Sequence, residues 1–134
     1  MNVRTIMWFV PLATFLALGV LRTLNPPMAQ AADEEALIAA IKLRSGDMGT
    51  EQERDRISAL EQQLSKAIKN SSAGDFDGDE YGGGTCTIYM YGPSAERLLS
   101  VALPILKKFN APSGSYVIKR FGKPGAKQTR IPLG

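Results

Sequence analysis

The sequence of 134 residues contains no histidine, one cysteine and one tryptophan. Without histidine the chain cannot build a Ser/His/Asp or Cys/His nucleophile system, and it lacks the side chain that most often transfers protons near neutral pH. The lone Cys86 excludes a disulfide within one chain. We therefore expect a non-catalytic protein without a cofactor, whose single core is large enough to fold without covalent cross-links.

Charged side chains are also absent from residues 6–21, near the N-terminus. This apolar run suits a signal peptide and is short for a bilayer span, which needs about 20 residues. Ala29-Gln30-Ala31 fits a cleavage site before Ala32. We expect export to the periplasm or the extracellular space after removal of residues 1–31. The alternative is an uncleaved N-terminal membrane anchor, for which Arg22 would supply a flanking charge.

Charge is uneven along the remaining chain. All 13 acidic residues lie between Asp33 and Glu96, and only basic charged residues follow from Arg97 onward. The chain from Ala32 is close to neutral, so the basic isoelectric point gives no argument for a nucleic-acid partner. This uneven distribution of charge is consistent with a contact between the acidic segment and the basic C-terminal part, either within one chain or between two copies. We expect another protein or a second copy as partner, and a membrane only if the N-terminal segment is uncleaved.

The most regular pattern is a strand over Thr85–Tyr91 with strict two-residue alternation. One face carries Cys86, Ile88 and Met90. These residues are expected to be buried in the core, which would leave Cys86 inert. The opposite face carries Thr85, Thr87, Tyr89 and Tyr91.

Two helices are predicted. Thr50 and Glu53 form a capping box that begins a helix running to about Asn70. A second helix is expected over Pro93–Phe109, with the proline in its first turn. Most polar side chains of the first helix are expected to be solvated: Glu51, Glu53, Arg54, Arg56, Glu61, Lys66 and Lys69.

The remaining patterns predict strands. Leu37–Arg44 is read as a strand, with a helix as the alternative, because its apolar run suits the middle of a sheet. Asp75–Tyr81 is polar and is placed at an edge. Ser115–Phe121 follows the second helix, and Gln128–Leu133 adds a short edge strand because of Pro132.

This order of elements predicts a single α+β domain over residues 32–134. It is the ferredoxin-like, split βαβ plan, in which an antiparallel sheet carries two helices on one face. The plan places the first and third strands in the middle of the sheet and the second and fourth at its edges. The two most apolar strand patterns fall in the middle positions.

Four segments resemble a family of small bacterial proteins with no assigned activity. They are GTEQERDRI, GDFDGDEYGGG, TCTIYMYGPSAERL and GSYVIKRFGKPGA, which begin at Gly49, Gly74, Thr85 and Gly114. The resemblance covers about Leu37 to Leu133. It supports the fold and its boundaries and implies no ligand or catalytic residue.

The acidic segment suggests a divalent-cation or small-ligand site. Its oxygen ligands would be Asp75, Asp77, Asp79 and Glu80. Calcium takes six to eight oxygens, so this set is short, and the spacing does not match an EF-hand. The alternative is an edge strand whose carboxylates are solvated and discourage pairing with other chains.

The strand face opposite the helices is the second candidate. Tyr89 and Tyr91 would lie there, with Lys119 or Arg120 from a neighbouring strand, and form a binding or self-pairing surface. The alternative is that these side chains only stabilise the sheet through cross-strand pairs. No RNP1 pattern accompanies the aromatic residues, so base stacking is not indicated. We expect an exported binding or self-associating module, and cation binding is the second hypothesis. The third is a hydrolase with paired carboxylates such as Asp77 and Asp79, although a short, exposed strand is a poor place to raise the pKa of one of them.

Overall fold

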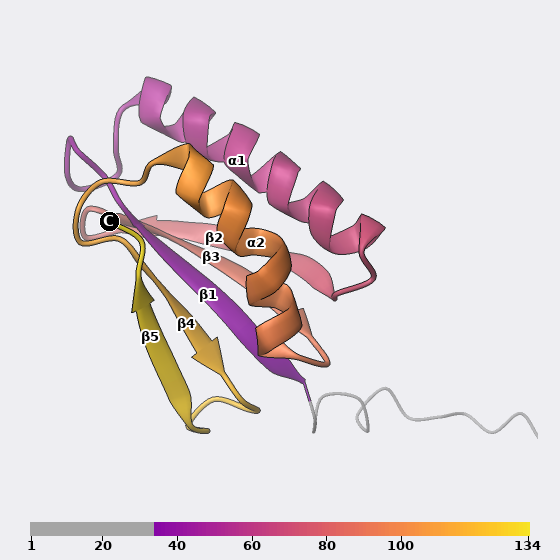
Figure 1. Ribbon diagram of the computed structural model, residues 1–134. Coiled ribbons are helices and arrows are strands. Elements are labelled where there is room, and N and C mark those ends of the chain that lie inside the picture. The colour runs from indigo at the N-terminus through magenta and orange to yellow at the C-terminus, as the bar shows by residue number, and fades with distance from the viewer. Residues whose placement is uncertain (1–33) are drawn as a thin grey trace, which may run out of the picture.

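Five antiparallel strands form one sheet, and two helices cover one of its faces (Figure 1). The computed structural model describes residues 34–134, so the predicted signal peptide lies outside the described residues. The α+β class is confirmed. Neither helix in this part of the chain has the length and apolar content of a membrane span. The elements are β1 (Glu35–Lys42), α1 (Glu51–Asn70), β2 (Asp75–Gly82), β3 (Thr85–Gly92), α2 (Ala95–Phe109), β4 (Tyr116–Arg120) and β5 (Gln128–Pro132).

The strands lie in the order β2-β3-β1-β4-β5. β1 is the middle strand, which confirms the strand prediction for this segment. Its apolar side chains lie on both faces. Ala36 and Ala40 are buried even on the face without helices, between larger side chains of β3 and β4, so a continuous apolar run suits this position. β2 lies at an edge, as predicted. The prediction that β4 is an edge strand is wrong, because β5 pairs along it from Tyr116 opposite Pro132 to Arg120 opposite Gln128.

The core lies between the sheet and the helices. Cys86, Ile88 and Met90 of β3 are fully buried there, as the alternation predicted. The apolar stripe of α1 packs against them with Ile57, Leu60, Leu64 and Ile68. α2 adds Ala95, Leu98, Ala102 and Leu106. The two helices therefore share one core with the same face of the sheet.

The helix starts are set by side-chain caps. The capping box of α1 is present: the Glu53 backbone N–H donates to Thr50 Oγ1 at 3.2 Å, and the Thr50 N–H donates to Glu53 Oε2 at 3.0 Å. α2 begins later than predicted, because Pro93 precedes the cap instead of lying in the first turn. Ser94 is the cap residue, and its hydroxyl accepts from the Arg97 N–H at 3.2 Å.

Two glycines allow β2 and β3 to meet closely at the end where β3 leads into α2. A Cβ at Gly74 would lie 2.0 Å from the Tyr91 carbonyl oxygen, and one at Gly92 would lie 2.3 Å from that of Ala73. No side chain fits at either distance. The backbones can therefore pass each other here only with glycine at both positions.

Candidate functional site

The sheet face opposite the helices, here called the open face, has an aromatic and aliphatic centre. No element within residues 34–134 covers it (Figure 1). Ile38 of the middle strand lies opposite Tyr89 on one side and Ile118 on the other, and all three are half-buried. The members assigned by strand register are Asp75, Gly78, Glu80, Gly82, Thr85, Thr87, Tyr89, Tyr91, Ala36, Ile38, Ala40, Lys42, Tyr116, Ile118, Arg120, Gln128, Arg130 and Pro132.

Polar contacts hold the aromatic side chains of the open face. The Tyr89 hydroxyl donates to Glu80 Oε1 at 2.9 Å, and partial burial followed by this carboxylate raises the pKa of Tyr89. The Arg130 guanidinium lies 3.4 Å from the ring centroid of Tyr116. The tyrosines are thus positioned before any partner arrives, which lowers the entropy lost on binding.

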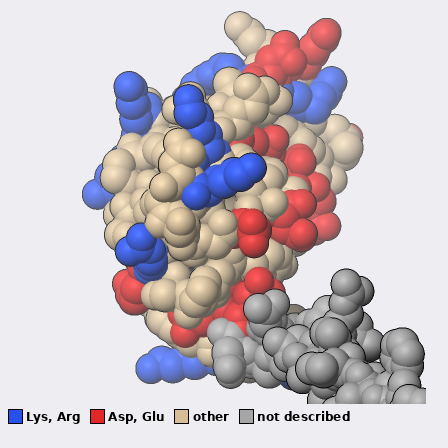
Figure 2. Space-filling model, turned by 90° about the vertical axis from the view of Figure 1, so that its right-hand side faces the viewer, with Lys and Arg blue, Asp and Glu red and all other residues tan. Residues whose placement is uncertain are grey.

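The open face is acidic on one side and basic on the other. Its acidic members, Asp75 and Glu80, lie on β2, whereas Arg120 and Arg130 lie on β4 and β5. Lys42, at the end of the middle strand, is the remaining charged member. The space-filling view shows a broad group of acidic side chains on its right-hand part, and further acidic side chains near basic ones at the top and at the lower left (Figure 2). The charge polarity of the sequence is therefore preserved across the strands of the folded sheet.

Only one of the two basic residues predicted for this face lies on it. Arg120 is on the open face, but Lys119 points to the helix side, where it forms an ion pair with Glu96 of α2. The prediction that placed Lys119 beside the tyrosines is therefore wrong. Neighbouring strand residues point to opposite faces, so at most one of the pair can lie there. The register of β4 against β1 decides which one.

The structure does not bring the four acidic residues of β2 together. All four are exposed, and Asp77 is the extra residue of a bulge between Phe76 and Gly78. The bulge changes the alternation. As a result, Asp75 and Glu80 occupy open-face positions, whereas Asp79 lies opposite Ile88 on the helix side.

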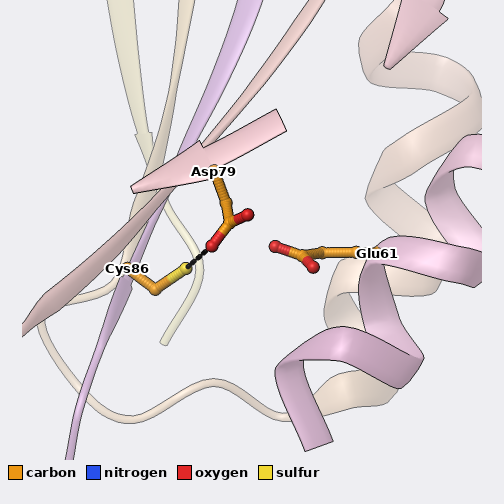
Figure 3. Close-up of side chains that lie close together, drawn as sticks. All are labelled: Glu61, Asp79 and Cys86. Carbon is orange, nitrogen blue, oxygen red and sulfur yellow. Dashed lines mark hydrogen bonds between the residues drawn. The ribbon is translucent and has the colours of Figure 1, made fainter. Parts of the chain in front are cut away.

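Asp79 instead joins a cluster that was not predicted. Its carboxylate, the Cys86 thiol and the Glu61 carboxylate converge from β2, β3 and α1 (Figure 3). One ligand atom from each lies within 4.8 Å of the others, and Cys86 Sγ is 3.9 Å from Asp79 Oδ2. Within residues 34–134 this is the one group of three metal-ligating side chains.

The cluster has perturbed proton affinities because it is partly shielded from water. Burial, and next the charge of Asp79, raise the pKa of Glu61 to about 7. Burial raises the pKa of the Cys86 thiol to about 12 and also raises the pKa of Tyr81, which lies next to Cys86. Near neutral pH the Glu61 carboxyl is therefore divided between its protonated and ionised forms, and the Cys86 thiol is neutral.

The prediction that the Glu61 side chain is solvated is wrong. It is half-buried, and its Oε1 is enclosed without a hydrogen-bond partner among residues 34–134. A groove of about 510 Å³ between α1 and β2 leads to it, lined in part by Phe76 and Lys66. Glu61 is four residues after the buried Ile57 and three before Leu64, so its helical position beside the apolar stripe was the available signal.

Comparisons with known protein families, curated proteins and solved structures found no match for this chain. The resemblance noted from the sequence therefore stays a prediction. Function has to be argued from the open face and the Glu61–Asp79–Cys86 cluster.

Proposed function

We propose that the domain is a non-catalytic binding module whose open face docks against a protein surface. The observation that supports this most directly is an uncovered sheet face with half-buried Tyr89, Tyr91, Tyr116, Ile38 and Ile118. Tyrosine is enriched at protein interfaces because it supplies rigid contact area and a polar end. No catalytic step is assigned, since the chain has no histidine.

The sheet edges are less suited to binding than this face. β2 carries four exposed acidic residues and a bulge, and the other edge strand, β5, contains Pro132. Charges, bulges and proline on edge strands oppose the addition of a further strand. Partner contact through side chains of the open face is therefore favoured over edge pairing.

Site-specific photo-crosslinking in the producing cells tests this proposal. A benzophenone side chain replaces Tyr89 on the open face or, as a matched control, the exposed Ser58 on α1. The expected result is one defined protein adduct from position 89, absent from position 58 and weakened by Arg120→Glu. Equal adducts at both positions, or none at position 89, would contradict the proposal.

We further propose that β1 to β4 and the two helices represent the ferredoxin-like plan, extended by β5. The order β-α-β-β-α-β of the first six elements supports this assignment. Export is likewise a proposal, and it rests on the sequence of residues 1–31. N-terminal sequencing of the protein from cells tests it: a chain beginning at Ala32 would support export, and one beginning at Met1 would support a membrane anchor.

Cation binding is a second candidate function, favoured by the enclosed and unpartnered Glu61 Oε1. Two carboxylates and a thiol are a donor set for a borderline cation such as Zn²⁺ and not for calcium, which prefers oxygen alone. Tetrahedral zinc ligands lie roughly 3.5 Å apart, so the cluster would close by about 1 Å around the ion. Of the acidic segment, only Asp79 would take part.

Calorimetry with Zn²⁺ and absorption spectroscopy with Cd²⁺ test the cation site. Binding through Cys86 would produce a thiolate-to-Cd²⁺ charge-transfer band that is lost in Cys86→Ser and weakened in Glu61→Gln. Asp75→Asn is the matched control, because Asp75 lies on the open face. No heat and no band at millimolar metal would exclude this function.

A further inference from the structure

We propose that the partner of the open face is a second copy of this chain, related by a two-fold axis that runs along β1. This inference rests on the proposed function and names its partner. It is carried by the order of charges across the face, acidic on β2 and basic on β4 and β5, with Ile38 in the middle strand between them.

Two copies that meet face to face have their two-fold axis in the plane between the sheets. An axis across the strands would place β2 over β2 in the reverse direction, so that the acidic strand of one copy would lie over the acidic strand of the other. An axis parallel to the strands exchanges the two sides of the sheet. It places β2 over β5 and β3 over β4. Arg130 is level with Gly78 in the register, but its guanidinium lies on Tyr116, which is level with Glu80, so the charged end of Arg130 comes near Glu80 of the second copy. Like charges close together oppose association, so the acidic and basic strands favour the parallel axis. Lys42, exposed at the end of β1, then lies over Lys42 of the second copy, at the rim of the interface where solvent screens the repulsion.

β1 is the third of five strands, so an axis along the middle of the sheet passes over it. Ile38 then meets Ile38 of the second copy. Tyr89 and Ile118 flank Ile38 in the strand register and form one row with it, so Tyr89 of one copy faces Ile118 of the other. In the next row Tyr91 faces Arg120, a pairing that repeats between copies the cation-aromatic contact present within one copy, at 6.0 Å. Apolar contacts lie at the centre and charged ones at the rim, which is the usual arrangement of an interface.

The area of the open face sets the expected affinity of the dimer. Five strands spaced about 4.8 Å apart and six residues of length give a surface about 24 Å by 20 Å, or roughly 500 Å² per copy. This is at the low end for specific interfaces. A reversible dimer with a dissociation constant in the micromolar range is expected, and added salt should weaken it.

Cysteine-specific crosslinking of the purified protein tests the axis. Packed sheets lie about 10 Å apart, so two residues on the axis are too far apart for a disulfide but within reach of a short bismaleimide. Ile38→Cys is expected to give a covalent dimer, and Ser58→Cys, exposed on α1, is expected to give none. Cys86 can remain, because it is fully buried. Equal crosslinking at the two positions would overturn the inference.

Charge reversal tests the pairing across the interface, with sedimentation equilibrium as the measurement. Glu80→Arg or Arg130→Glu alone should raise the dissociation constant about ten-fold, and the double variant should restore it. Lys119→Ala is the matched control, because Lys119 lies on the helix side. A dimer insensitive to all three changes would overturn the arrangement.

A protein that stays monomeric at millimolar concentration would overturn self-association itself. The proposed function would then still stand if position 89 crosslinks to a different protein in cells. Absence of both the dimer and the position-specific adduct would remove the function as well. The two failures are thus distinguishable.

Discussion

The guanidinium of Arg120 on β4 lies 6.0 Å from the ring centroid of Tyr91 on β3, although β1 runs between these strands. The residue between them in the register is Ala36, and its small side chain leaves room for the two larger ones to meet above it. Glu34 and Lys123 line the same shallow depression. This contact joins the two sides of the open face across its middle strand.

The Glu61 carboxyl should make the stability of the fold decrease as pH rises. Its pKa is raised from 4.5 to about 7 in the folded state, mainly by burial, so the folded protein holds this proton more tightly than the unfolded chain does. The contribution of Glu61 to the free energy of unfolding is fully present below pH about 4.5 and is lost as pH rises through about 7. Urea unfolding at several pH values should show this decline in the wild type and not in Glu61→Gln. A parallel decline in both would contradict it; Asp55→Asn, exposed on α1, is the control.

Glu53 should act in the opposite direction, at acidic pH. Hydrogen bonds from Ser45 and then from the Thr50 backbone lower its pKa to about 2. The folded state therefore favours the carboxylate, and this contribution is present above pH 4.5 and lost as pH falls toward 2. Acid unfolding followed by circular dichroism should show a steeper loss of stability in the wild type than in Glu53→Gln. Equal slopes would show that the Ser45 and capping-box contacts do not form in solution.

Gly92→Ala should destabilise the fold strongly. The added Cβ would lie 2.3 Å from the Ala73 carbonyl oxygen, so the backbones of two segments would have to separate. Overpacking of this kind costs on the order of 1 to 3 kcal/mol. Gly82→Ala is the matched control, because a Cβ there meets nothing within 4 Å. Thermal denaturation should show a large decrease in the midpoint temperature for Gly92→Ala and almost none for Gly82→Ala.

Cys86 should not react with thiol reagents in the native state. It is fully buried and its pKa is raised to about 12, so little thiolate is present and access is blocked. Ellman's reagent should modify it only after unfolding in urea, whereas the Ile38→Cys variant should react at its new thiol without denaturant. Rapid modification of the native wild-type thiol would contradict the burial.

Much of the fold followed from local patterns. Alternation along β3 predicted its buried face, because successive strand side chains must point to opposite sides. The capping box predicted the start of α1, because its donors and acceptors lie within four residues of one another. The polar composition of β2 predicted an edge position. Each of these features depends only on residues close together in the chain.

The sites depended on contacts between distant segments, which only the tertiary structure decided. The bulge at Asp77 separates Asp79 from Asp75 and Glu80, and α1 brings Glu61 to Asp79 and Cys86. The sequence determined that Lys119 and Arg120 lie on opposite faces of their strand. Which of them joins the tyrosines depends on how β4 pairs with β1, since a shift of one residue in that register would exchange them.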